Sequence, residues 1–310
     1  MSEITLIEKI QALKKEKNAV ILAHYYQNGD IQDVADYVGD SLGLSIEAKK
    51  TNADIIVFAG VHFMAETAKI INPSKRVLVP DMSAGCSLAD SCTPEKFKAF
   101  KDKYPKHTTI TYVNCSAEIK AMSDIVCTSS NALKVVESVP LDTPIIFAPD
   151  KNLGAYIMKK TGRDMILWDG ACVVHESFSL EKLIQLKLKY PKAKIVSHPE
   201  SEQQILKYSD FIGSTSEMKE YIIQSDADVF IVATEEGILH GLKKLVPNKI
   251  LVPAPIYDDN VCACGECAYM KVNTLQKVYN CLLNETPEIS ISAELIEKAK
   301  VPIERMLQIK

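Results

Sequence analysis

The sequence contains no apolar run that approaches the roughly 20 residues needed to cross a membrane. It also carries little excess charge, since 36 Lys and Arg residues against 40 Asp and Glu residues give a formal net charge of -4. Binding to nucleic acid requires many cationic contacts with phosphates, so this balance argues against a nucleic-acid partner. Residues 1–18 lack the uninterrupted apolar stretch of a signal peptide and have the pattern of an amphipathic helix. We therefore expect a cytoplasmic protein with neither a membrane nor nucleic acid as its partner.

Three local signatures are absent as well. The sequence has no G-x-G-x-x-G or G-x4-G-K-[ST] phosphate loop, which argues against a nicotinamide or nucleotide site. It also lacks the Cys-x2-Cys-x2-Cys-x3-Cys run of ferredoxins. A function that only passes electrons is therefore less well supported than one in which a bound molecule loses water.

What the 310-residue chain does contain is a long-period repeat. It is 47% hydrophobic and 25% charged, enough for a substantial core, and short β-branched runs alternate with helical patterns along it. The runs fall into three groups of four, and corresponding positions recur with a period of about 85 to 90 residues. The first runs of the three groups end at His24, Asn114 and His198. Nearly continuous apolar strands between helices indicate parallel sheets that are covered on both faces.

The predicted fold is therefore α/β, with three homologous αβα domains that each hold a small four-stranded parallel sheet. We expect pseudo-threefold symmetry around one central active site. The predicted boundaries are 1–87, 88–173 and 174–269 for the three repeats, with a C-terminal helical extension at 270–310 that packs back on the body. Helices are predicted between successive strands: 31–37, 42–50 and 62–71 in the first repeat, 117–122, 132–137 and 153–160 in the second, and 201–208, 217–224 and 237–245 in the third.

Polar side chains follow the predicted strands of all three repeats. Ligands of open parallel sheets bind beyond the carboxyl ends of the strands, so these side chains are candidates for a shared cavity. The candidates are His24, Tyr26, Ser41, Tyr112, Asn114, Ser129, His198, Glu200 and Thr215. The hydroxyl residues among them precede helices, where they act as simple N-caps, bind anions, or do both. The two histidines fit either a satisfied core position or a catalytic role, and His198-Pro-Glu200 fits an acid/base pair.

The nine cysteines do not form an obvious disulfide framework, because the count is odd and no export signal is present. Cysteine nevertheless follows the fourth strand of every repeat: Cys86 in the first, Cys172 in the second, and the group Cys262, Cys264 and Cys267 in the third. Three thiolates from related loops can converge on one metal centre. The remaining four, Cys92, Cys115, Cys127 and Cys281, are expected to be buried structural residues.

Three thiolates leave the usual four-ligand shell of zinc or of a [4Fe-4S] cubane incomplete. An iron with an open position can act as a Lewis acid on a substrate hydroxyl or carboxylate. A zinc lyase or hydrolase and an oxygen sensor remain alternative interpretations of the same cysteines.

The chain resembles the quinolinate synthase family, the A protein of de novo NAD biosynthesis, over essentially its whole length. Short segments spread along all three repeats carry the resemblance. They are residues 23–27 (AHYYQ), 39–45 (GDSLGLS), 58–66 (FAGVHFMAE), 80–90 (PDMSAGCSLAD), 111–117 (TYVNCSA), 127–132 (CTSSNA), 149–154 (PDKNLG), 168–175 (WDGACVVH), 198–200 (HPE) and 213–216 (GSTS).

The resemblance implies a [4Fe-4S] cluster at the centre of a triangular three-domain fold. It implies a reaction that condenses iminoaspartate with dihydroxyacetone phosphate to quinolinate, with loss of phosphate and two waters. The implied functional partner is L-aspartate oxidase or aspartate dehydrogenase, which would supply the unstable imine. By residue match, Cys86, Cys172 and Cys267 would hold the cluster. The catalytic residues would be His24, Tyr26, His198 and Glu200, and the substrate-binding residues His24, Ser41, Tyr112, Val113, Asn114, Ser129, His198, Pro199, Glu200 and Thr215.

One segment departs from the pattern of the family. Some members carry two further cysteines upstream of the third ligand in Cys-x2-Cys-x2-Cys spacing, whereas this chain has Cys262-x-Cys264-x2-Cys267. The stretch Cys267-Ala-Tyr-Met-Lys271 matches the family, so Cys267 is the expected ligand, with Cys262 and Cys264 as alternatives.

Overall fold

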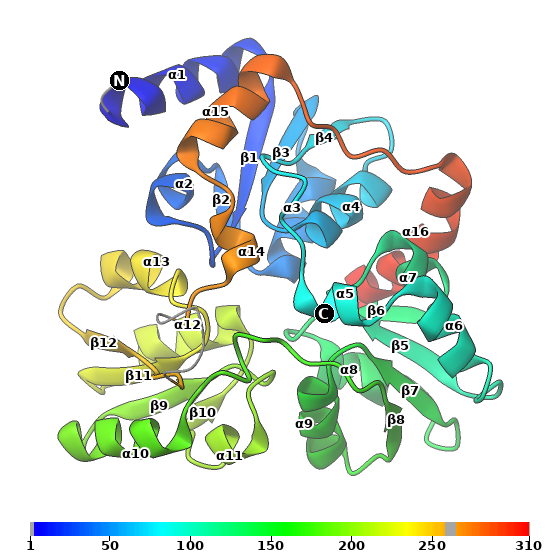
Figure 1. The fold of residues 1–310 in the computed structure, drawn as a ribbon, viewed down its shortest axis with the longest axis vertical. Coiled ribbons are helices and arrows are strands. Elements are labelled where there is room, and N and C mark those ends of the chain that lie inside the picture. Colours follow the sequence, from blue (N-terminus) through cyan, green and yellow to red (C-terminus); the bar gives the residue numbers. More distant parts are fainter. Residues whose placement is uncertain (1–2, 258–264, 310) are drawn as a thin grey trace.

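The computed structural model describes residues 3–257 and 265–309. Within them lie three four-stranded sheets in which every strand pair is parallel, as Figure 1 shows. The strands are β1 (Ala19–His24), β2 (Tyr37–Gly39), β3 (Ile55–Ala59) and β4 (Arg76–Leu78), then β5 (Thr108–Tyr112), β6 (Ile125–Cys127), β7 (Ile145–Ala148) and β8 (Met165–Leu167), then β9 (Lys194–Ser197), β10 (Phe211–Ile212), β11 (Val229–Ala233) and β12 (Ile250–Pro253). In each sheet the second strand lies outermost beside the first, giving the orders β2-β1-β3-β4, β6-β5-β7-β8 and β10-β9-β11-β12. The predicted fold class is confirmed.

The three repeats share a structural detail beyond their topology. In each one, an aspartate just before the second strand accepts a hydrogen bond from a backbone N–H in the first strand. The pairs are Asp36 with Ile21, Asp124 with Thr109 and Asp210 with Ile195, at 2.7 to 2.8 Å. The carboxylate satisfies a backbone N–H of the first strand at the point where the second strand has not yet begun. In the first repeat the chain is already extended here, so the helix predicted to reach Tyr37 ends at Val34 instead.

Helices connect the strands within each repeat and cover both faces of each sheet. They are α2 (Gly29–Val34), α3 (Ser41–Lys50) and α4 (His62–Ile71), then α7 (Ala117–Ala121), α8 (Ala132–Glu137) and α9 (Lys151–Thr161), then α11 (Gln203–Leu206), α12 (Thr215–Gln224) and α13 (Ile238–Leu245). Every residue of β3 and β7 is buried, as expected for parallel strands with helices on both sides.

Three helices between the repeats were not predicted. They are α5 (Ser87–Ser91), α6 (Pro94–Lys101) and α10 (Leu180–Lys189). A serine cap precedes α10, where the Ser179 side chain accepts from the backbone N–H of Lys182. The predicted N-terminal amphipathic helix is present as α1 (Glu3–Glu16). Among the described residues, no helix combines the length and the apolar character that crossing a bilayer requires.

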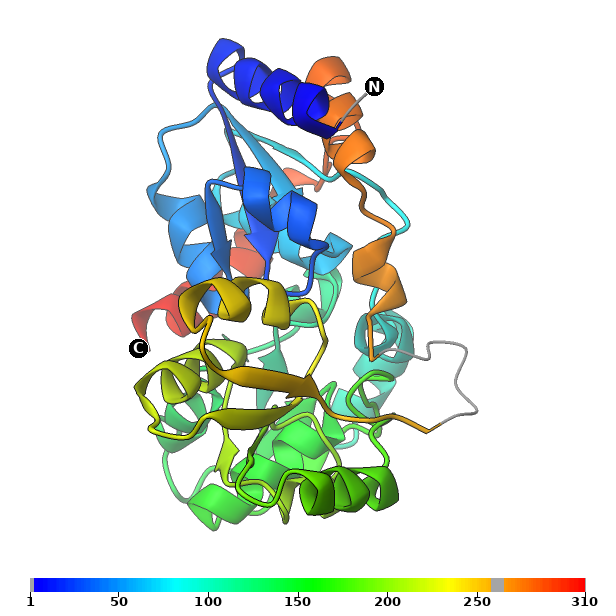
Figure 2. The same ribbon diagram turned by 90° about the vertical axis from the view of Figure 1, so that its left-hand side faces the viewer.

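The C-terminal segment returns from the third repeat across the other two, which Figures 1 and 2 show in orange and red. It comprises α14 (Ala268–Lys271), α15 (Leu275–Asn284) and α16 (Ala293–Gln308). Helix α15 packs on α1 and β3 of the first repeat, and α16 packs on α7 and β6 of the second. At the turn between them, Glu285 pairs with Lys17 and Arg76. The exact limits of the repeats, 87/88, 173/174 and 269/270, remain a prediction.

Candidate active site

A cavity of about 720 Å³, partly open to solvent, lies where the three repeats meet. Its lining includes four predicted site residues from each repeat, and most of them follow the carboxyl end of a strand. They are His24, Tyr26, Ser41 and Cys86, then Tyr112, Asn114, Ser129 and Cys172, then His198, Glu200, Thr215 and Cys267. Two predicted residues, Val113 and Pro199, are buried but do not line the cavity. The backbone N–H of Val113 instead donates to the Cys127 carbonyl.

The three hydroxyl residues at the cavity are not helix caps. The caps are Asp40 for α3, Asn131 for α8 and Ser214 for α12, and Ser214 forms a capping box with Glu217. The possibility that Ser41, Ser129 and Thr215 serve as caps is therefore wrong, because a neighbouring residue occupies each position. Their hydroxyls remain available to the cavity. One of these caps, Asp40, also accepts a hydrogen bond from Ser130 Oγ at 2.7 Å, and this bond joins the first repeat to the second.

The three predicted metal-binding cysteines approach one another at the cavity. A negative charge on Cys86 or Cys267 would raise the pKa of Cys172, so the three sulfurs lie within one another's electrostatic range. Burial raises the pKa of Cys86 to about 12, while the backbone N–H groups of Ala89 and Leu88 point at its sulfur and oppose that rise. Burial likewise raises the pKa of Cys267 to about 11. Buried sulfurs that receive N–H groups are suited to hold a metal as thiolates.

The other described cysteines match their predicted structural role. Cys92, Cys115, Cys127 and Cys281 are buried, and each packs within a hydrophobic cluster. None of the seven described cysteines forms a disulfide. The alternative ligands Cys262 and Cys264 lie outside the described residues.

Glu200 is the centre of the polar contacts in the cavity. It is 3% exposed. Its Oε1 accepts a short hydrogen bond from the Tyr112 hydroxyl, and its Oε2 lies 3.0 Å from His175 Nδ1. On the other side, His198 Nδ1 lies 3.6 Å from Oε1, and His198 Nε2 lies 3.1 Å from Ser129 Oγ. The predicted His198–Glu200 pair therefore exists, and it is joined by a second histidine.

Burial and these contacts set the charge of the site. Burial alone would raise the pKa of Glu200, but His175, His198 and the Tyr112 hydroxyl outweigh it and bring that pKa to about 2. Burial lowers the pKa of His24 to about 4 and that of His198 to about 3, although nearby carboxylates oppose both changes. At neutral pH the site therefore presents an ionised carboxylate beside neutral imidazoles, a combination suited to accepting protons.

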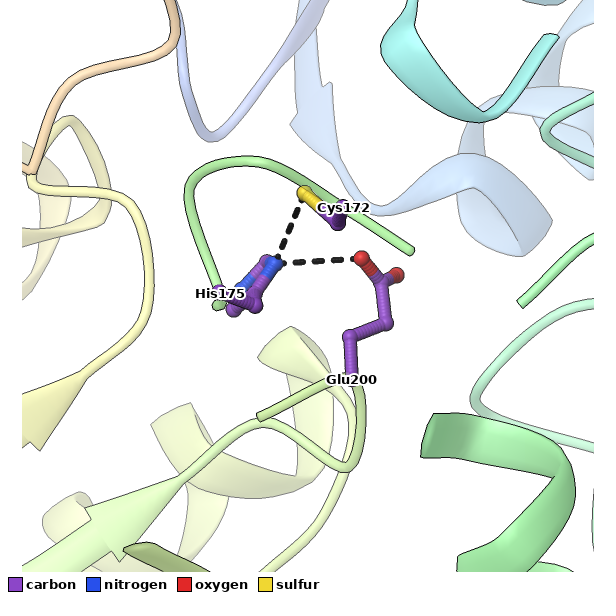
Figure 3. Close-up of side chains that lie close together, drawn as sticks. All are labelled: Cys172, His175 and Glu200. Atoms are coloured by element: carbon purple, nitrogen blue, oxygen red, sulfur yellow. Dashed lines mark hydrogen bonds and ion pairs between the residues drawn. The ribbon is translucent and has the colours of Figure 1, made fainter. Parts of the chain in front are cut away.

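His175 is a site residue that the sequence analysis did not select. Figure 3 shows that one nitrogen of its ring, Nδ1, faces both the sulfur of Cys172, 3.2 Å away, and the carboxylate of Glu200. Ligand atoms of Cys172, His175 and Glu200 all lie within 4.8 Å of one another, so these three side chains could hold a metal ion. The spacing Cys172-x2-His175, directly after a predicted strand, was the signal that could have identified it.

Glu235 is a further polar residue at the cavity that the sequence analysis did not select. Glu235 accepts from the backbone N–H groups of Cys267 and Gly237 and pairs with Lys271 at 3.0 Å. Burial raises the pKa of Glu235 to about 7 although Lys271 opposes the rise. Asn114, by contrast, has a buried Oδ1 with no hydrogen-bond partner in the described residues. A buried polar atom of this kind on a cavity wall marks a position for a ligand donor.

Comparisons with known proteins extend this description. Residues 8–308 match the sequence profile of the family described as quinolinate synthetase A protein. A quinolinate synthase of Microcystis aeruginosa is 60% identical over 303 residues, covering 98% of this chain and 94% of that protein. The quinolinate synthase of Gloeothece citriformis is 59% identical, covering 98% and 93%. That of Chloroherpeton thalassium is 59% identical over 309 residues, covering 100% and 96%.

Proposed function

This chain belongs to the quinolinate synthetase A protein family, and from that membership we propose how its central cavity makes quinolinate. It is an enzyme of NAD biosynthesis whose reaction condenses iminoaspartate with dihydroxyacetone phosphate to quinolinate, phosphate and two waters. The observation that carries the proposed site is the meeting of one cysteine from each repeat at the cavity that also holds Glu200. A shared fold alone does not specify a reaction. The cysteines and Glu200 at this cavity can, however, bind and transform anionic substrates.

Cys86, Cys172 and Cys267 hold a [4Fe-4S] cluster in this proposal. The donor set fits the group, because the three cysteines line one cavity and backbone N–H groups point at their sulfurs. Cys86 and Cys267 each immediately precede the first turn of a helix, α5 and α14. A cluster held by these three cysteines would supply Lewis acidity that favours loss of a hydroxyl as water.

The substrates carry carboxylates and a phosphate, and the described lining of the cavity can hold them with no lysine or arginine among its residues. Ser41 and Thr215 are the first residues of α3 and α12, where free backbone N–H groups favour an anion. Ser129 and Asn114 add a hydroxyl and an amide from the second repeat. In the proposal Val113 and Pro199 contribute as backbone neighbours of Asn114 and Glu200.

Proton transfer is assigned to the groups around Glu200. The carboxylate accepts a proton from the bound intermediate, and Tyr112 and His175 stabilise its ionised form by hydrogen bonds. His24 and His198, which burial keeps neutral, accept or return protons during isomerisation, imine formation and ring closure. Tyr26 contributes its phenol at the side of the cavity formed by the first repeat.

The location and the partner follow from the substrates. We propose that the enzyme works in the cytoplasm and takes iminoaspartate from L-aspartate oxidase or aspartate dehydrogenase, because the imine is too unstable to accumulate. A quantitative binding assay between the purified enzymes tests whether they associate directly. An unchanged signal at micromolar concentrations would mean that the imine arrives by free diffusion.

A mononuclear zinc ion is the competing occupant of the site. The grouping of the Cys172, His175 and Glu200 side chains supports a zinc ion, since sulfur, imidazole and carboxylate are all zinc ligands. Cys172 would serve in both arrangements, so metal analysis separates them. Protein purified without air should contain iron and sulfide in equal amounts, whereas zinc without sulfide would contradict the cluster.

The decisive experiment is product formation by that same preparation. Supplied with oxaloacetate, ammonia and dihydroxyacetone phosphate, the enzyme should form quinolinate, and removal of its iron should stop the reaction. Iron-loaded protein that forms no quinolinate would contradict the proposed function and would favour a sensing role for the metal.

A further inference from the structure

A continuous line of hydrogen bonds crosses the site from the first repeat to the second. It begins at the Tyr26 hydroxyl, which lies 2.6 Å from Thr234 Oγ1, and Thr234 Oγ1 lies 2.9 Å from His175 Nε2. His175 Nδ1 then contacts Glu200 Oε2 at 3.0 Å, and Glu200 Oε1 accepts from Tyr112. Neither the motifs nor the cavity lining identified Thr234. It follows β11 directly but does not line the cavity.

The direction of these hydrogen bonds can be assigned from their end at Glu200. Both neighbours of His175 Nδ1 accept hydrogen bonds: the carboxylate of Glu200 and the sulfur of Cys172, as in Figure 3. Nδ1 therefore carries the proton, and the other ring nitrogen, Nε2, is an acceptor in the neutral imidazole. The Thr234 hydroxyl must donate to that nitrogen. Its oxygen is then free to accept from the Tyr26 hydroxyl.

Burial makes this arrangement specific. Thr234 and His175 are each 2% exposed, so water cannot replace the threonine hydroxyl without a rearrangement. The Tyr26 ring is held from a second side by His24, whose ring lies edge-on at a centroid distance of 4.4 Å. Tyr26 and Thr234 belong to different repeats, so the hydrogen bond between them also fixes how the first repeat sits against the third at the cavity.

We propose that Thr234 is a positioning residue: its hydroxyl accepts from Tyr26 and donates to His175, and so it orients both rings toward the reacting molecule. With its proton turned toward Thr234, the Tyr26 oxygen presents lone pairs to the cavity and acts there as an acceptor. Burial raises the pKa of Tyr26 well above its ordinary value, which agrees with a phenol that keeps its proton. His175 is held with its N–H toward Glu200 by the same hydroxyl.

Two substitutions of near-equal size test the hydroxyl itself. Thr234→Val removes it, and Thr234→Ser keeps it. In enzyme purified without air, with iron and sulfide measured for each variant, Thr234→Val should lower kcat by roughly 10- to 100-fold and change KM for dihydroxyacetone phosphate little. Thr234→Ser should stay within about threefold of the parent. Equal losses in both variants, accompanied by a lower melting temperature, would show a packing role and overturn the proposal.

A double-mutant cycle tests the connection to Tyr26. If Thr234 acts through that phenol, Tyr26→Phe combined with Thr234→Val should lose little more activity than the worse single variant. Losses that multiply would mean that the two residues act independently, contrary to the proposal.

The kinetic tests rest on the proposed function, so a readout without turnover is also needed. Crystal structures of the Thr234→Val and Thr234→Ser enzymes give one. The Tyr26 hydroxyl or the His175 ring should move in the valine variant and keep its place in the serine variant. Rings that stay in place in both would overturn the positioning role, whatever the reaction. An inactive parent enzyme with displaced rings in Thr234→Val would instead count against the proposed function alone.

Discussion

The rings of His175 and His198 are stacked at the centre of the molecule, with centroids 4.8 Å apart and planes inclined by 30°. One follows the fourth strand of the second repeat, and the other follows the first strand of the third. Both face the carboxylate of Glu200. A single buried anion therefore serves two imidazoles from separate loops, and several expectations depend on it.

The first expectation concerns that carboxylate. Glu200→Gln keeps the size of the side chain and removes its charge, so Tyr112 and His175 lose the anion that accepts their hydrogen bonds. Quinolinate formation should fall by about 100- to 10,000-fold, the usual contribution of a positioned acid or base. Glu202→Gln makes the same change two residues away, where the side chain is partly exposed, and should leave the rate nearly unchanged. Comparable rates in the two variants would remove Glu200 from the mechanism.

The second expectation concerns metal binding. Replacing Cys86, Cys172 or Cys267 singly by Ser should abolish the iron and sulfide content of protein kept from air, because each is assigned as a ligand. Cys92→Ser and Cys281→Ser alter buried cysteines in hydrophobic clusters away from the cavity and should retain both. The measurement is iron and acid-labile sulfide per chain. Loss of iron in Cys92→Ser with retention in Cys86→Ser would invalidate the repeat alignment.

The third expectation is a loss of stability in mild acid that depends on His24. Burial lowers the pKa of His24 to about 4, against an ordinary value of 6.5. Below pH 6.5 the unfolded chain takes up a proton that the folded chain refuses, so the free energy of unfolding falls as the pH drops toward about 4. The full effect is roughly 3 kcal/mol at about 1.4 kcal/mol per pKa unit. Urea unfolding of the parent and of His24→Asn at pH 7.5 and pH 4.5 measures it. The variant should lose less stability than the parent, and equal losses would contradict this origin.

The fourth expectation concerns the attachment of the C-terminal segment. Lys277 of α15 donates to Asp81 Oδ2 at 2.5 Å, and this bond lowers the pKa of Asp81 to about 2. A lowered carboxyl pKa stabilises the fold above about pH 4, and the contribution disappears as the pH falls through about 2. Because both side chains are partly exposed, Asp81→Asn should cost only about 1 kcal/mol at pH 7. Asp142→Asn, at an exposed loop position, is the matched control. A cost that persists undiminished at pH 2 would mean that the ion pair is not its source.

Much of the architecture could be predicted because a buried parallel strand leaves a clear trace in the sequence. The helices α4 (His62–Ile71) and α8 (Ala132–Glu137) begin and end where the pattern predicts. Each lies between two strands of one repeat, so three copies of the same pattern support its limits. The helices α5, α6 and α10 lie outside the strand-to-strand connections from which the repeat was recognised, which is why they were missed. Helices α6 and α10 precede the first strands of their repeats, as α1 does in the first.

The candidate site was predicted in outline for a related reason. Residues directly after strands of parallel sheets share one edge, so His24, Ser129 and Glu200 could be placed at one cavity before any distance was known. His175 and Thr234 were not selected, because their importance lies in contacts with Glu200 and Tyr26 that no sequence pattern shows. The cap assignments failed for a local reason, since Asp40, Asn131 and Ser214 each precede or follow the hydroxyl by one or two residues.

The path of the last 40 residues has a consequence for biosynthesis of the enzyme. Helix α16 completes its contacts with α7 and β6 of the second repeat only after the chain has passed through the third and crossed the first. Because the ribosome synthesises the chain from its amino end, α16 emerges after all three repeats. Before that stage, Cys86, Cys172 and Cys267 belong to a protein that still lacks the contacts of α16. Under the proposed cluster, a chain that stops before α16 should therefore bind iron poorly.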